Sequence, residues 1–131
     1  MPYNEPQSLV YNFPEMDFGA TAGDTVHRLA GPEGKKGRLK SVGVVATEEF
    51  LCDSTNAQIK VGTTSDDDAY ALLNITDELA DGARCNEADD TDAIIDADIP
   101  ADGVVEVTLV EGTDGTGVTG KGYPYVIIDW Y

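Results

Sequence analysis

The chain has 131 residues, the length of a single domain. Its 25 acidic and 8 basic residues give a formal net charge of -17, which disfavours nucleic acid and anionic membrane surfaces as partners because both repel a negative surface. No apolar run approaches the ~20 residues of a membrane-spanning helix, and the N-terminal residues lack the basic and apolar regions of a secretory signal.

The acidic residues are mostly Asp and are spread over most of the chain, whereas Lys is scarce. Like charges at this density work against the compact state at low salt, and at ~1 M salt a Debye length of ~3 Å removes most of the repulsion. This excess of acidic over basic residues is explained by a salt-loving host. A mesophilic protein kept soluble by its acidic surface is the alternative, and the sequence leaves both open.

The segment of residues 1–24 differs from the rest of the chain. Its three prolines disfavour a regular helix, while its apolar content is unlike that of a disordered tail. The apolar side chains, which follow no clear period, are Tyr3, Leu9, Val10, Tyr11, Phe13, Met16 and Phe18. The sequence predicts an extended N-terminal arm, laid either on a neighbouring molecule or over the core of its own domain.

Residues 25–131 predict short strands separated by turns. Alternating or short apolar runs indicate strands over residues 25–30, 36–47, 57–62, 93–99, 103–111 and 121–131. Residues 69–75 fit a strand or a short helix, residues 76–92 fit a polar loop, and turns are expected at 31–34 and 112–120. Because no long amphipathic helix is present, the pattern predicts an all-β domain, a β-sandwich of jelly-roll or immunoglobulin-like topology.

The last predicted strand has apolar side chains on both of its faces. One face carries Tyr123, Tyr125 and Ile127, and the other carries Val126, Ile128 and Trp130. Such a strand is expected at the centre of a sheet, or covered by a neighbour.

Candidate catalytic and metal-binding residues are few. Asp66–Asp68 and the acidic stretch 89–98 offer carboxylates to calcium, but neither has the Gly and Glu spacing of an EF-hand loop, and solvated acidic loops are the alternative. His27 lies within a strand pattern and is expected to be structural. Cys52 and Cys85 do not make a usual zinc site with a single histidine, and buried free thiols are favoured over a disulfide. The sequence predicts no enzyme activity, no metal site and no cofactor.

The basic residues are clustered. Five of the eight fall within thirteen positions, and these are Arg28, Lys35, Lys36, Arg38 and Lys40. A basic patch on so acidic a domain is a docking point for an acidic partner surface through steering and ion pairs at the rim of the contact. Neutralisation of nearby acidic residues within the domain is the alternative.

Several short motifs, in this order along the chain, resemble those of a known family. They are AGPEGKKGRL at residues 30–39, ATEEF at 46–50, VGT at 61–63, DDAYA at 67–71, IPAD at 99–102, GKG at 120–122 and VIIDWY at 126–131. Together they resemble the small head decoration, or capsid cement, proteins of tailed viruses. The resemblance covers roughly residues 28–131 and leaves out the N-terminal arm.

The resemblance implies a β-sandwich, often a homotrimer, bound to the major capsid protein on the outside of an icosahedral shell, with neither enzyme activity nor a cofactor. It places the protein in the virion after synthesis in the host cytoplasm. With the arm as a clamp on the shell and the basic patch as a docking point, the expected contact residues are Tyr3, Leu9, Tyr11, Phe13 and Phe18 in the arm, and Lys35, Lys36 and Arg38 in the basic turn.

Two rival functions follow from other interpretations of the same residues. One is a virion protein that anchors a fibre or turret at the vertices or the tail. The other is a calcium-dependent carbohydrate-binding module with Tyr123, Tyr125 and Trp130 as a sugar platform.

Overall fold

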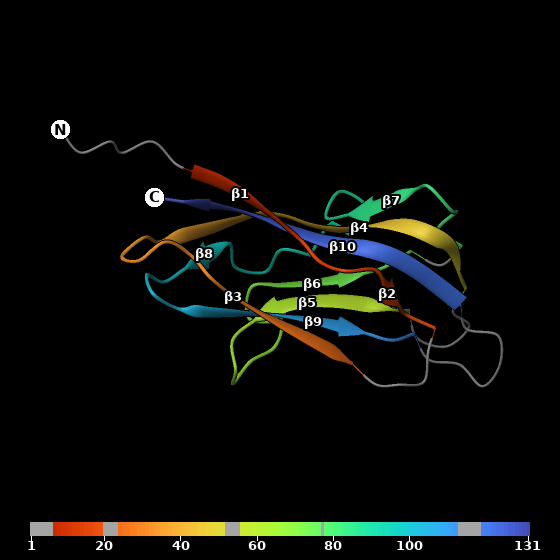
Figure 1. Ribbon diagram of the computed structural model, residues 1–131, viewed down its shortest axis with the longest axis horizontal. Helices are drawn as coiled ribbons and strands as arrows, with labels where there is room; N and C mark the ends of the chain where they lie inside the picture. The colour runs from red at the N-terminus through yellow and green to blue at the C-terminus, as the bar shows by residue number, and fades with distance from the viewer. Residues whose placement is uncertain (1–6, 20–23, 52–55, 77, 113–118) are drawn as a thin grey trace.

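The computed structural model describes residues 7–19, 24–51, 56–76, 78–112 and 119–131 (Figure 1). Within these ranges the chain forms strands and no helix, and the strands make two antiparallel sheets packed in two layers. The predicted all-β sandwich is therefore confirmed.

The first sheet, sheet A, has its two longest strands at its centre. In spatial order it contains β1 (Gln7–Asn12), β10 (Thr119–Trp130), β4 (Gly37–Leu51) and β7 (Arg84–Asn86), with the short β2 (Met16–Asp17) on β10 and β8 (Asp98–Ile99) on β4. The second sheet, sheet B, contains β3 (Thr25–Ala30), β9 (Val104–Val110), β5 (Gln58–Gly62) and β6 (Ala71–Asn74) in that order. The prediction of a central last strand is confirmed, since β10 lies between β1 and β4.

The strand order decides between the two predicted topologies. Apart from the short β2 and β8, successive strands cross from one sheet to the other, and only β5 and β6 follow each other within a sheet. This is the order of an eight-stranded jelly roll, whereas the first two strands of an immunoglobulin-like sandwich share a sheet.

The core lies between the two sheets and follows the period of two expected of strands. On β9, for example, Val105, Val107 and Leu109 are fully buried between the sheets. Phe18 and Phe50 pack against each other with ring centroids 5.3 Å apart. Trp130 is also buried, and its indole N–H donates a hydrogen bond of 2.9 Å to the Tyr11 hydroxyl.

Some elements differ from the sequence prediction. The strand predicted over 36–47 continues to Leu51, residues 71–74 form a strand and no helix, and β7 lies inside the predicted polar loop. The strand predicted over 93–99 is reduced to β8 and one bridge at Ile94. There the Asp96 carboxylate accepts a hydrogen bond from the backbone N–H of Asp98 (3.0 Å), and such a local bond competes with a strand ladder.

The described part of the N-terminal arm belongs to the sandwich. All six residues of β1 pair with β10, and β2 pairs with the same strand further along. Residues 7–19 therefore pack on their own domain, which is one of the two alternatives for the arm. They are part of the sandwich, although the predicted domain boundary lies after residue 24. Tyr3 lies outside the described residues.

Candidate binding face on the outside of sheet A

The outer face of sheet A carries a group of apolar side chains that no other element covers among the described residues. On β10, Tyr123, Tyr125 and Ile127 point away from the core, as their alternation with buried residues requires. The register places Val10 of β1 beside Ile127 and Val45 of β4 beside Tyr123. We call these five residues the tyrosine face.

The tyrosine face is open to solvent. Val10 is 56% exposed and Tyr123 is 50% exposed, while the other three residues are half-buried. A shallow hollow of about 230 Å³ runs over it, and its lining consists of the five residues together with Asn12 and Arg84. An exposed group of large apolar residues on an otherwise highly charged protein is typical of an interaction surface.

The sequence around the tyrosine face fixes the position of Tyr125. A Cβ at Gly43 would lie 2.5 Å from the Tyr125 hydroxyl oxygen and 2.8 Å from the carbonyl oxygen of Cys85, so only glycine leaves room for the ring across β4. The guanidinium carbon of Arg84, on β7, lies 5.6 Å from the centre of the Tyr125 ring, in cation–π contact. The ring is therefore held in place by two neighbouring strands.

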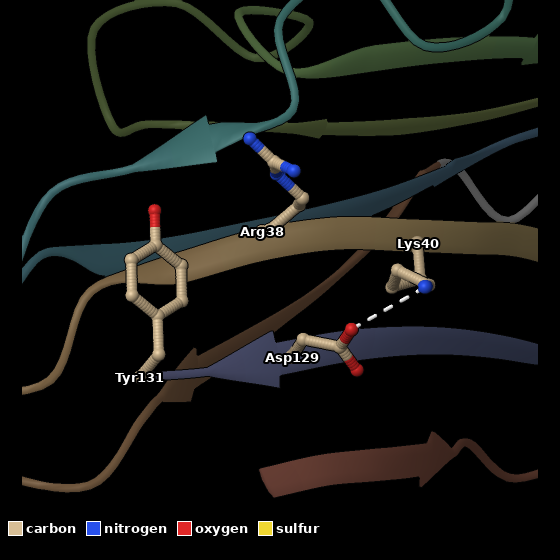
Figure 2. A pocket seen from close by; sticks show the side chains of 4 residues that line it. All are labelled: Arg38, Lys40, Asp129 and Tyr131. Atoms are coloured by element: carbon tan, nitrogen blue, oxygen red, sulfur yellow. Dashed lines mark ion pairs between the residues drawn. The ribbon is translucent and has the colours of Figure 1, made fainter. Parts of the chain in front are cut away.

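A basic end adjoins the tyrosine face near the end of β10. Figure 2 shows Arg38 and Lys40 of β4 around Asp129 and Tyr131, which line a hollow of about 350 Å³. Lys40 pairs with Asp129 at 3.4 Å, while Arg38 makes only a looser pair with Asp98 at 3.8 Å. Lys36 lines a second hollow that shares Tyr131 with the first. We call Lys36, Arg38 and Lys40 the basic end.

The basic residues are divided unevenly between the two sheets. On sheet B, Arg28 pairs with the mostly buried Glu106 (3.1 Å) and Lys60 pairs with Asp67 (3.3 Å). Every other basic residue lies on β4, β7 or β10, or in the turn that leads into β4. Neutralisation thus describes Arg28 and Lys60, and also Lys40 and Arg38 through their pairs with Asp129 and Asp98. Six of the eight basic residues lie on or beside sheet A.

The predicted basic contact residues lie on the surface. Lys35, Lys36 and Arg38 are all exposed, and no ion pair involves Lys35 or Lys36 within the residues that the structure describes. Their exposure agrees with a docking role.

The predicted arm contacts lie differently. Phe13 and Phe18 are buried in the core of their own domain, and Phe13 stacks on His27 with ring centroids 4.7 Å apart. Leu9 and Tyr11 are half-buried against the same core. The prediction that Phe13 and Phe18 contact a partner is therefore wrong for the described fold, because both rings lie in the core. For the half-buried Leu9 and Tyr11 a partner contact stays a prediction. Val10, on the opposite face of the same strand, is the exposed apolar residue of the segment.

Sequence analysis missed Val10, Val45 and Arg84 as members of the binding face. The alternation of β10 did identify Tyr123, Tyr125 and Ile127 as sharing one face. The partners of β10 in the sheet depend on long-range pairing, so local alternation gave no signal for the other three.

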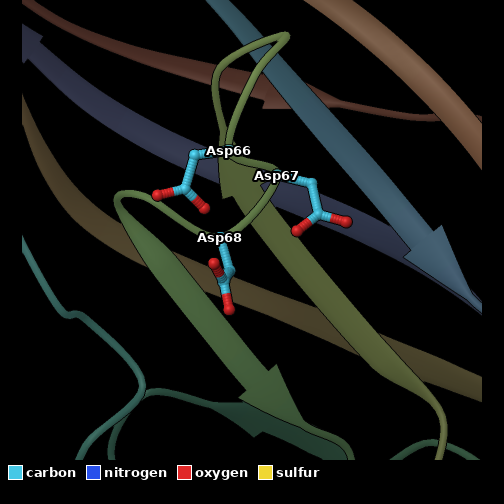
Figure 3. A group of neighbouring side chains, drawn as sticks. All are labelled: Asp66, Asp67 and Asp68. Carbon is cyan, nitrogen blue, oxygen red and sulfur yellow. The ribbon is translucent and has the colours of Figure 1, made fainter.

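The acidic clusters occupy loops. The carboxylates of Asp66, Asp67 and Asp68 lie in the β5–β6 loop with ligand atoms within 4.8 Å of one another (Figure 3). Lys60 pairs with one of them, Asp67, and the backbone C=O of Asp66 accepts a hydrogen bond of 2.7 Å from the N–H of Thr63.

In the other acidic stretch, three carboxylates accept hydrogen bonds from backbone N–H groups, two of them within their own turns and one, Asp90, from the end of β6. Asp89 accepts from the N–H of Asn86 and Asp90 from the N–H of Asn74, both at 3.0 Å, as Asp96 does from Asp98. Asp89 and Asp96 therefore act as turn formers, while Asp90 ties its loop to β6.

Other candidate residues from the sequence are structural. Cys85 is a buried free thiol, as favoured from the sequence, and Cys52 lies outside the described residues. Trp130 points into the core, away from Tyr123 and Tyr125, so the three aromatics do not form one sugar platform. Burial raises the pKa of Tyr70, and the nearby Asp96 carboxylate raises it further.

Comparison with known proteins found no matching family model, no matching curated protein and no matching solved structure. In the described part of the chain, no helix has the length and apolar character needed to cross a membrane.

Proposed function

We propose that this protein is a virion structural protein, a decoration or cement protein that binds the outside of an icosahedral capsid and stabilises it across subunit junctions. The single observation that carries the proposal is the outer face of sheet A, where the tyrosine face and the basic end lie side by side on a strongly acidic domain. The motifs that resemble the decoration proteins support the major capsid protein as the proposed partner.

The tyrosine face supplies the apolar part of such a contact. Burial of apolar surface contributes about 25 cal/mol per Å², and tyrosines are enriched at the centres of interfaces because a rigid ring loses little entropy when it is covered. Tyr125 is already held by Gly43 and Arg84, so binding has less disorder to remove from it.

The basic end supplies orientation. With a net charge of -17, the domain is repelled by most acidic surfaces. The exposed Lys36 and Arg38 reverse that sign locally and steer one side of the domain towards an acidic patch. Because a shell repeats the same contact many times, each copy needs only a modest binding energy.

The decisive experiment is a count of this chain against the major shell protein in purified virus particles, by quantitative mass spectrometry. A ratio near one, or a large fixed fraction of it, is expected for a decoration protein. A few tens of copies would indicate the rival fibre or turret anchor at vertices or tail. Absence from particles would contradict any virion role.

The face that binds is tested on particles stripped of the protein. Tyr123→Ser removes an exposed ring from the tyrosine face, and we expect at least about a tenfold loss of binding, the size of effect seen at the centre of interfaces. Val26→Ser is the matched control, because Val26 is 47% exposed on β3 of the other sheet. Equal binding by both variants would show that another surface makes the contact.

A further inference from the structure

The free edge of β1 is unlike the other strand edges of the sandwich. β1 reads QSLVYN and has no charged residue, in a chain where a quarter of the residues are charged. Natural sheets protect their edges with charges, with very short strands or with covering segments, because an open edge invites pairing with another chain.

The other edges are protected in these ways. In sheet A, the edge formed by β7 and β8 consists of strands of three and two residues. In sheet B, β3 carries Arg28, and β6 is covered by residues 93 and 94, which bond to Leu72 and Ala71. Within the described residues, β1 is the edge that lacks such protection.

The backbone groups on the free edge of β1 can be assigned. The N–H of Phe13 donates to the C=O of Pro124 (3.0 Å), one step beyond the pair Asn12–Tyr125. Hydrogen-bonded and non-hydrogen-bonded pairs alternate in an antiparallel ladder. The N–H and C=O groups of Leu9 and Tyr11 therefore face β10, and those of Ser8, Val10 and Asn12 face outward.

From this geometry we infer that β1 pairs with β1 of a second copy of this chain, antiparallel about a twofold axis that passes beside Val10. In this register Val10 lies opposite Val10 of the second copy, and Ser8 lies opposite Asn12 in both directions. All three outward-facing residues then exchange both of their backbone hydrogen bonds. Shifting the register by two residues leaves some of these groups without a partner.

The side chains fit the same register. Val10 meets its own copy on the outer face, while Leu9 meets Tyr11 on the inner face, and apolar cross-strand pairs of this kind stabilise sheets. Ser8 and Asn12 form a polar pair. No like charges meet between the two strands, which matters because two copies of so acidic a chain repel each other nearly everywhere else.

The pairing joins the two copies of sheet A into one continuous sheet, and their tyrosine faces become neighbours on its outer side. This inference goes beyond the proposed function and stands without it. It also differs from the homotrimer that the family resemblance implies, because self-pairing of one edge about a twofold axis closes at two copies.

The oligomeric state is measured by analytical ultracentrifugation over a wide concentration range in ~2 M salt, where charge repulsion is screened. We expect a concentration-dependent monomer–dimer equilibrium. Val10→Pro removes an N–H that β1 does not use towards β10, and proline is tolerated at such an edge position. We expect this variant to weaken the dimer by at least about tenfold, through loss of two hydrogen bonds at the axis, while Val10→Thr keeps the N–H and dimerises.

A cysteine series tests the register independently of stability. In a Cys52→Ser background, Val10→Cys is expected to form a disulfide-linked dimer on oxidation, because paired residues lie ~5.5 Å apart between Cα atoms, within disulfide range. Ser8→Cys alone is expected not to link, whereas Ser8→Cys with Asn12→Cys is expected to do so.

Four results would overturn the inference: a wild-type monomer at every concentration, a trimer, a dimer unaffected by Val10→Pro in a variant shown to be folded by circular dichroism, or linkage through Ser8→Cys alone. None of these results changes the copy number expected in virus particles, so failure here is distinguishable from failure of the proposed function.

Discussion

A missing side chain gives the tyrosine face its shape. Gly43 lies on the central strand β4, where β-branched residues are favoured, yet any Cβ there meets the hydroxyl of Tyr125 and the backbone of β7. Close approach explains the glycine, and the ring that occupies the space is held between two strands. Packing at a single position thus links the stability of sheet A to the surface that we propose to bind the shell.

Gly43→Ala is expected to destabilise the domain by about 1–3 kcal/mol, since the added methyl group forces the ring or β7 to move. Urea denaturation measures the change. Gly103→Ala is the control, because a Cβ there meets only the carbonyl oxygen of Pro100, at 3.3 Å. If both variants unfold at the same urea concentration, the Tyr125 ring is not held over Gly43.

Tyr70 is expected to make the stability of the folded protein depend on pH in the alkaline range. Burial raises the pKa of Tyr70 first, and the Asp96 carboxylate raises it further. The folded protein therefore holds the phenol proton more tightly than the unfolded chain, so this stabilisation is complete below the ordinary tyrosine pKa of about 10 and is lost as pH rises above it. We expect urea midpoints between about pH 8 and 11 to fall more steeply for the wild type than for Tyr70→Phe. Parallel pH profiles would contradict this assignment.

Among the elements, β1 has the role least expected from the sequence. Its inner face holds Leu9 and Tyr11 against the core, and the chain that follows it delivers Phe13 and Phe18 to the interior. The segment predicted as an extended arm thus contains an edge strand and core residues of the sandwich.

Removal of residues 1–18 is therefore expected to unfold the domain. It deletes the pairing with β10 and two buried aromatic rings, each of which costs about 3–5 kcal/mol when truncated in a core. This reverses the expectation for a separable arm, whose deletion would leave the domain folded. Circular dichroism and thermal unfolding measure the outcome, with removal of residues 1–6 as the control that keeps β1. If the protein without residues 1–18 unfolds cooperatively at the wild-type temperature, the segment is a separable arm and not part of the sandwich.

Local alternation predicted most strands and could not predict their neighbours. The segments around β3, β5, β9 and β10 were correct because each shows a period of two between turn residues. β7 was missed because three residues among acidic turn formers make no pattern of their own, and they become a strand only beside β4. For the same reason the sequence identified the outward side chains of β10 and not Val10, Val45 and Arg84, which lie beside them on β1, β4 and β7.

At the scale of the whole molecule, the charge is unevenly placed. Sheet B carries two basic residues, each paired with an acid, while the other six lie on one side, on or beside sheet A, where two of them also pair with acids. The rest of the surface carries a large excess of negative charge. Such a molecule has a preferred orientation in the field of a partner.

The excess charge predicts that salt stabilises the fold. We expect the melting temperature to fall as NaCl is lowered from ~2 M to ~0.1 M, because the Debye length grows and like charges repel. Thermal unfolding followed by circular dichroism measures this, with sucrose as the control, since it is excluded from protein surfaces but does not screen charge. A constant melting temperature across this range of salt would argue against a halophilic host.

The pairing of β1 with β10 joins segments that are far apart in the sequence, since Gln7 lies beside Trp130. During synthesis on the ribosome, β1 and β4 cannot pair through β10 until the end of the chain has been made, because β10 follows every other described strand. A sheet that depends on such distant segments forms slowly, and during that delay the neutral edge of β1 is exposed beside other unfinished chains. We therefore expect the heavy negative charge of the remaining sequence to matter before folding is complete, because it keeps nascent chains apart until β10 is in place.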